Sequence, residues 1–139
     1  EQQVPFVNLE GQDFSAYLNF CLNQKAQWVI LAGFLKKIPI DLLEAYPDRI
    51  INIHPSLLPN YGGAGMYGKK VHEAVGAAHE SFSGISIHLV NEEFDKGKLL
   101  FQHAVKLPEN ASPEQIESSV RALELTHFAQ DLETYLSSN

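Results

Sequence analysis

The chain has 139 residues, of which 45% are apolar, and a formal net charge of -7. This length suits one domain with its own core, so we expect a single domain over residues 1–139. The acidic balance argues against nucleic-acid or anionic-membrane partners, because both select for Lys and Arg patches. Cys21 is the only cysteine, which excludes an intrachain disulfide and fits the reducing cytoplasm.

The first half of the chain predicts strands alternating with helices. Residues 4–9 predict a short strand, and apolar residues spaced three and four apart predict a helix over residues 14–24. The continuous apolar run over residues 28–32 is typical of a strand covered on both faces, and it is far too short to span a bilayer. A short helix over residues 41–45 then precedes a strand over residues 50–54.

The second half opens with a glycine-rich loop over residues 56–68, followed by an amphipathic helix over residues 69–78. Two alternating segments, residues 84–89 and 99–107, predict strands that a short linker joins as an antiparallel pair. Ser112, Pro113 and Gln115 form a capping-box signature at the start of a final helix that runs to about Tyr135. Its buried stripe contains Ile116, Val120 and Leu123. The whole pattern predicts an α/β fold of three layers, a mostly parallel twisted sheet with helices on both faces.

The segment over residues 51–59 carries the candidate chemistry. Asn52 and His54 share one face of a strand, roughly 7 Å apart along the backbone. Pro55 ends the strand behind them, at the carboxyl edge where open α/β sheets bind ligands. Either residue alone has an ordinary structural explanation, since a histidine at a strand end is often structural and an asparagine can cap a turn. Their shared face makes an active site the leading hypothesis.

Three segments, residues 31–34, 51–59 and 86–97, resemble the folate-dependent formyltransferases in order and approximate spacing. Pro55 directly after His54 resembles the phosphoribosylglycinamide formyltransferases more than the related deformylases. The resemblance implies transfer of a formyl group from 10-formyltetrahydrofolate to glycinamide ribonucleotide in purine biosynthesis. It also implies that Asn52, His54 and Asp95 are catalytic, although an aspartate before Lys96 and Gly97 is by itself usually a turn former.

The same resemblance implies two binding regions. The histidines lack a metal-binding spacing, so we expect no metal, and the implied reaction needs no covalent nucleophile. Residues expected to bind the folate are Leu35, Lys36, Lys37, Ile38, Asn52, Asn91, Glu92, Glu93, Phe94 and Asp95. Residues expected to approach the ribonucleotide are Pro55, Arg121, Ala122, Leu123 and Glu124. For Glu124 an exposed helix glutamate remains the alternative. Residues 63–68 satisfy a dinucleotide-binding glycine pattern, but they do not follow a predicted strand, so we do not expect a dinucleotide site.

Two departures from the family pattern limit these implications. The family's first strand and its glycine-rich phosphate loop are not found, so we expect an N-terminally truncated domain, about the C-terminal two-thirds of the usual one. Its partners would then include the missing segment or a homo-oligomer. Met66 and Tyr67 also stand where the commoner pattern has a further histidine. A formyltetrahydrofolate deformylase and a catalytically silent folate-binding fragment therefore remain alternatives to the formyltransferase.

Overall fold

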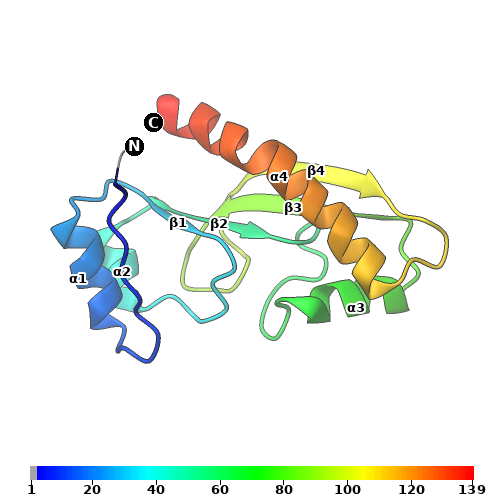
Figure 1. Cartoon of the computed structure of the whole chain (residues 1–139), viewed down its shortest axis with the longest axis horizontal. Helices are drawn as coiled ribbons and strands as arrows, with labels where there is room; N and C mark the ends of the chain where they lie inside the picture. Colours follow the sequence, from blue (N-terminus) through cyan, green and yellow to red (C-terminus); the bar gives the residue numbers. More distant parts are fainter. Residues whose placement is uncertain (1–2) are drawn as a thin grey trace.

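The computed structural model describes residues 3–139. The elements in chain order are α1 (Ser15–Asn23), β1 (Val29–Leu31), α2 (Ile40–Ala45), β2 (Ile50–His54), α3 (Lys69–Ala77), β3 (Phe82–Leu89), β4 (Leu99–Lys106) and α4 (Pro113–Ser137) (Figure 1). Each of these elements overlaps a predicted one. Within the described part of the chain, no helix has the length and apolar character needed to cross a membrane.

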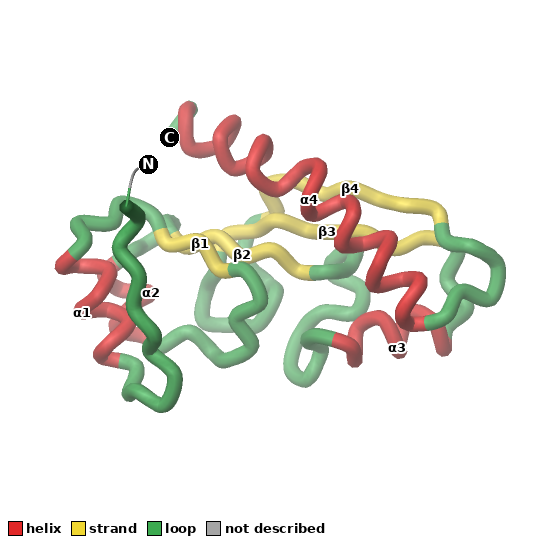
Figure 2. The backbone as a smooth tube through the Cα atoms, in the orientation of Figure 1, coloured by secondary structure: helices red, strands yellow, loops and turns green. Residues whose placement is uncertain are grey.

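The strands form one sheet in the order β1-β2-β3-β4 (Figure 2). β1 and β2 run parallel, whereas β3 is antiparallel to both of its neighbours. The expected α/β class is confirmed, but the sheet is mixed instead of mostly parallel. The antiparallel pairing of β3 with β4 was expected from their short connection, because parallel strands need a crossover of roughly a dozen or more residues. The difference lies in β3, which is antiparallel to β2.

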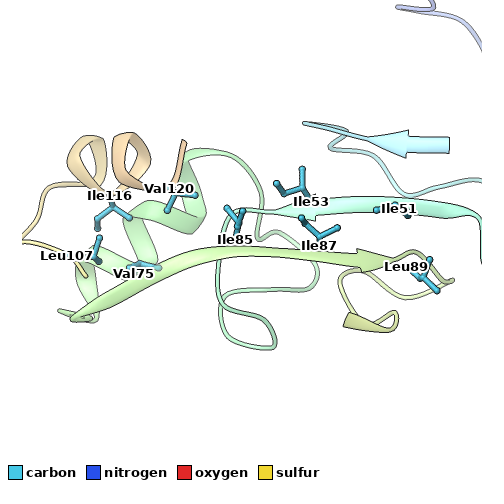
Figure 3. Close-up of a cluster of buried hydrophobic side chains, with 9 residues drawn as sticks. All are labelled: Ile51, Ile53, Val75, Ile85, Ile87, Leu89, Leu107, Ile116 and Val120. Carbon is cyan, nitrogen blue, oxygen red and sulfur yellow. The ribbon is translucent and has the colours of Figure 1, made fainter. Parts of the chain in front are cut away.

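Alternation along β2 sends side chains to two faces, and helices cover both. Ile51 and Ile53 join Ile85 and Ile87 of β3 in a buried cluster beneath α3 and α4 (Figure 3). On the opposite face, Ile50 packs with buried residues of α2, and α1 adds partly buried side chains. A fully buried isoleucine contributes roughly 1.5–3 kcal/mol. The predicted three-layer arrangement is therefore confirmed, and its core fixes β2 and β3 at the centre.

The predicted strand over residues 4–9 is wrong. This segment has no regular secondary structure, and the side chains of Val4 and Phe6 are 82% and 90% exposed. A strand needs a neighbour to satisfy its backbone N–H and C=O groups, and in the described sheet β1 pairs only with β2. β1 is also not covered on both faces, because Ile30 is 36% exposed.

The long helix α4 begins as the sequence predicted. The Ser112 hydroxyl accepts from the backbone N–H of Gln115 at 3.2 Å, and the Gln115 side chain accepts from the backbone N–H of Ser112 at 2.9 Å. This capping box satisfies donors that the first helical turn leaves unpaired. Ile116 and Val120 are buried, and Leu123 packs against the same cluster. The cap thus fixes where the helix starts and which side chains face the sheet.

Candidate active site

The antiparallel register of β2 and β3 gathers four polar side chains on one face of the sheet. Asn52 lies opposite His88, and His54 lies opposite Ser86. Directly opposed residues point to the same side, so the pair on β2 meets a matching pair on β3. Asn52 and His54 lie on one face of the sheet, as predicted, and His88 and Ser86 of β3 lie on the same face.

His54 is buried, and both of its ring nitrogens face acceptors. Nε2 lies 2.7 Å from the carbonyl oxygen of Tyr61, and Nδ1 lies 3.3 Å from Oδ1 of Asp95. A carbonyl oxygen only accepts, so Nε2 carries a proton. An ionised Asp95 also accepts, so the doubly protonated imidazolium satisfies both contacts. The geometry thus directs Nδ1 of His54 at the carboxylate.

The turn between β3 and β4 delivers Asp95, and two glycines allow its position. Asp95 has a left-handed backbone, with φ at 56°, a region that aspartate tolerates better than most residues. A Cβ added to Gly97 would lie 1.6 Å from the carbonyl oxygen of Leu89. A Cβ added to Gly62 would lie 3.3 Å from that of Asp95 and 2.4 Å from a Leu58 methyl group. The backbone contact at Gly97 requires glycine, whereas the two contacts at Gly62 are with side chains.

The environment of Asp95 keeps its carboxyl ionised. Burial disfavours the charged form and raises the pKa, but hydrogen bonding with His54 and His88 and a 3.0 Å hydrogen bond from the Gly63 N–H outweigh it. The pKa of Asp95 therefore lies well below its usual range. A permanent negative charge in a buried site favours a cation beside it.

His88 is a further buried imidazole of the site. Its Nδ1 faces the carbonyl oxygen of Leu89 at 2.9 Å, while Nε2 lies 3.2 Å from Nδ2 of Asn52 and 3.5 Å from Oδ1 of Asp95. Neutral His88 accepts from the Asn52 amide, whereas protonated His88 donates to Asp95. When His88 is neutral, the Asn52 amide nitrogen uses one of its two N–H groups in the contact with His88 and keeps the other free.

A cleft of about 490 Å³ opens beside these side chains. Predicted site residues that line it are Leu35, Lys36, Lys37, Ile38, Asn52, His54, Pro55, Asn91, Glu92, Glu93, Phe94, Asp95, Arg121 and Glu124. The segment after β1, the end of β2, the turn after β3 and one face of α4 therefore meet around one hollow. Segments that are distant in sequence form a single candidate site.

Two predicted residues lie outside the cleft. Ala122 is exposed, and Leu123 packs against the core. With 3.6 residues per turn, Arg121, Glu124 and Phe128 share the helix face that lines the cleft, whereas the two residues between the first pair point elsewhere. Burial raises the pKa of Glu124, and the nearby Arg121 partly opposes that rise.

The prediction from sequence missed several lining residues, His88 above all. Met66 and Tyr67 of the glycine-rich loop and Phe128 of α4 also line the cleft. Pairing β3 against β2 in antiparallel register would have placed His88 opposite Asn52, so the signal was present in the alternation of residues 84–89. Nothing in the local sequence marks the Tyr61 carbonyl as a partner of His54.

An α/β domain that brings an amide, two imidazoles and a carboxylate to an open cleft at the carboxyl end of a central strand has the layout of a catalytic domain. The chain belongs to the formyl transferase family, which it matches over residues 10–132. It is 52% identical over 93 residues to the chloroplastic phosphoribosylglycinamide formyltransferase of Arabidopsis thaliana, covering 67% of this chain and 32% of that protein.

Solved structures agree with this family assignment. The phosphoribosylglycinamide formyltransferase of Bacillus halodurans superposes with a TM-score of 0.80 at 31% identity, covering 88% of this chain and 61% of that one. A formyltetrahydrofolate deformylase from Pseudomonas syringae pv. tomato gives a TM-score of 0.81 at 26% identity, covering 95% and 43%. The chain thus spans less than two thirds of each of these relatives. Among residues 3–139, no group of three His, Cys, Asp or Glu side chains is arranged to hold a metal ion.

Proposed function

We propose that this chain carries the catalytic site of a phosphoribosylglycinamide formyltransferase. The reaction moves a formyl group from 10-formyltetrahydrofolate to the primary amine of glycinamide ribonucleotide, a step of de novo purine biosynthesis. The observation that carries the proposal is the ionised Asp95 held against His54, with Asn52 beside them, at the wall of the cleft. The 52% identity to a relative of that name supports the choice of substrates.

The reaction needs a hydrogen-bond donor for a negative oxygen and a group that transfers protons, and these side chains can supply both. Attack of the amine on the formyl carbon gives a tetrahedral intermediate with a negative oxygen and a positive nitrogen. The free N–H of the Asn52 amide can donate to that oxygen. His54 can give a proton to the folate nitrogen as the bond between that nitrogen and the formyl carbon breaks, and it can take a proton back from the positively charged attacking nitrogen. Asp95 stabilises the imidazolium between these two transfers. No covalent nucleophile is required. Ser56 is fully buried and donates to the carbonyl oxygen of Asn60.

We place the two substrates on opposite sides of this centre. The pterin end of the folate would lie against residues 35–38 and 91–95, where backbone groups and the half-exposed rim residue Phe94 border the cleft. The ribonucleotide would approach Pro55 and the α4 face with Arg121 and Glu124. The Glu124 carboxylate can accept a hydrogen bond from a substrate hydroxyl or amine.

The deformylase remains the alternative activity, since the same side chains could direct water to the formyl carbon. Pro55 directly after His54 favours the transferase. The two reactions differ in whether formate appears when the amine is absent. A protein that binds folate without either reaction would fit the silent-fragment alternative.

The deciding experiment measures formyl transfer by the purified protein to glycinamide ribonucleotide, with formate release measured in parallel. Native mass spectrometry of the same sample identifies any separately supplied segment or second copy, the two partners that we propose. We expect transfer, with His54→Ala and Asp95→Asn each lowering kcat by about 10²–10⁴-fold, and ribonucleotide binding near normal. Glu109→Gln, at an exposed carboxyl, is the control. Near-normal turnover in both site variants would refute the assigned roles.

The expected cytoplasmic location is also a proposal. It rests on the single cysteine, while the two plant relatives are named chloroplastic. Fractionation of source cells, with the activity assayed in each fraction, tests it. Activity confined to an organelle fraction would contradict it.

A further inference from the structure

A row of polar side chains crosses three strands behind the site. Ser86 of β3 lies opposite His54 of β2, and Gln102 of β4 lies opposite Ser86. Directly opposed residues of antiparallel strands point to the same face. His54, Ser86 and Gln102 therefore form one line across the sheet, although they come from three separate parts of the chain.

Ser86 is fully buried, and its hydroxyl uses its full hydrogen-bonding capacity. It donates to the carbonyl oxygen of Ser56 at 2.7 Å and accepts from the Leu58 N–H and from Nε2 of Gln102, both at 3.0 Å. The same Gln102 nitrogen donates to the carbonyl oxygen of Leu58 at 3.0 Å. Two side chains thus hold the backbone that follows His54 at three points.

The backbone held in this way leads directly to the acceptor of His54. The Ser56 hydroxyl donates to the carbonyl oxygen of Asn60 at 2.6 Å, and the Asn60 N–H donates to that of Leu57 at 3.1 Å, so the turn is closed on itself. The next carbonyl, on Tyr61, lies 2.7 Å from Nε2 of His54. This contact keeps Nε2 protonated and turns Nδ1 toward Asp95.

We infer that Ser86 and Gln102 are positioning residues for His54. Neither side chain is hydrogen-bonded to the imidazole, and neither lines the cleft. They hold the turn over residues 56–61, and that turn presents the carbonyl that fixes which ring nitrogen faces the carboxylate. The catalytic meaning of this inference rests on the proposed function. The hydrogen-bond relay, which runs from Gln102 and Ser86 through residues 56–61 to His54, rests on the hydrogen-bond contacts alone.

The test uses Gln102→Leu in the intact protein, because Gln102 is exposed and its removal leaves the core untouched. NMR follows the Nε2 proton of His54, which a buried 2.7 Å hydrogen bond protects from exchange with water. We expect that proton to exchange roughly tenfold or more faster in Gln102→Leu, because the turn opens more often. Lys106→Met, on the same face of β4 without a bond to the turn, should leave the exchange rate unchanged.

Kinetics supply the second readout. If positioning matters for transfer, kcat falls by about 10- to 100-fold in Gln102→Leu while KM for the ribonucleotide changes little. Ser86→Ala removes the bonds to the Ser56 carbonyl oxygen and the Leu58 N–H from the buried side, and it should act in the same direction on both readouts. An unchanged Nε2 exchange rate in both variants overturns the inference. Faster exchange with unaltered kcat also overturns it, because the relay would then be structural only. Absence of turnover in the unsubstituted protein overturns the proposed function instead, and the exchange rate still decides whether the relay exists.

Discussion

Asp95 is a carboxylate whose charge is stabilised only in the folded chain. Its pKa lies below the usual range when folded, whereas in the unfolded chain it titrates near about 3.9. Between these values the unfolded chain binds a proton that the folded chain does not, so stability is lost as the pH falls. The contribution of Asp95 is fully present above about pH 5 and declines at lower pH.

We expect Asp95→Asn to be less stable than the unsubstituted protein near neutral pH, with the gap narrowing as the pH falls. Each tenfold difference in proton affinity between the folded and unfolded chain corresponds to about 1.4 kcal/mol. Urea unfolding between about pH 6 and pH 3 measures the gap. Glu109→Gln should show no such narrowing. A gap that stays constant across this range would mean that the charge of Asp95 is not stabilised by the fold.

At the scale of single residues, the sequence predicted the centre of the site and most of the residues around it, but not all of them. Asn52 and His54 were predictable because alternation along a strand is local. His88 was not assigned, because its place depends on how two distant strands pair. The family resemblance included Ala122 and Leu123 in the ribonucleotide region, although helical periodicity separates them from the cleft.

The turn between β3 and β4 can pack against the Leu89 backbone only because position 97 is glycine. Gly97→Ala places a methyl carbon inside contact distance of the Leu89 carbonyl, and backbone cannot move aside as a side chain can. We expect a loss of about 1–3 kcal/mol in the free energy of unfolding, together with displacement of Asp95 from His54.

Gly76→Ala provides the matched control for this substitution. Its added methyl carbon meets the end of the Ile116 side chain at 3.3 Å, which can shift, and alanine favours the helix α3. Urea unfolding and the NMR signals of His54 compare the two variants. Equal effects of both substitutions would contradict the role assigned to Gly97.

The capping box of α4 gives a second prediction at this scale. Ser112→Ala removes the acceptor for the Gln115 N–H and should lower the free energy of unfolding by about 1 kcal/mol. Ser119→Ala is the control, since that exposed hydroxyl only bonds to a carbonyl of its own helix. Urea denaturation measures both, and a loss in Ser119→Ala as large as in Ser112→Ala would contradict the prediction.

Elements with local signals were predictable, and those that depend on partners were not. The capping box and the amphipathic helix α3 carry their information within a few residues, and both were found. Residues 4–9 have the composition of a strand, yet they lack a neighbour to pair with. The direction of β3 relative to β2 likewise depends on a long connection whose path no local pattern specifies.

For the molecule as a whole, the cleft links ligand binding to stability. It is lined by segments from the first, middle and last thirds of the chain, so a ligand that fills it stabilises the entire fold. At 100 times its Kd, a ligand that binds only the folded chain adds about 2.7 kcal/mol. We expect 5-formyltetrahydrofolate, an unreactive relative of the donor, to raise the thermal midpoint in this way.

Thermal unfolding with and without ligand measures the shift. Para-aminobenzoylglutamate, which lacks the pterin ring, is the control and should give a much smaller shift at the same concentration. Equal shifts for the two ligands would contradict pterin binding beside residues 35–38 and 91–95.

The pairing of β2 with β3 also determines what happens when the protein misfolds. A slip of one residue would turn the isoleucines of β3 toward the site and send His88 and Ser86 into the core. Such a molecule would lose His88 from the site, the hydrogen bonds that hold residues 56–61, and the apolar cluster together. No partly active form would therefore remain. A poorly folded preparation should therefore contain fewer active molecules, and each active molecule should have the normal kcat.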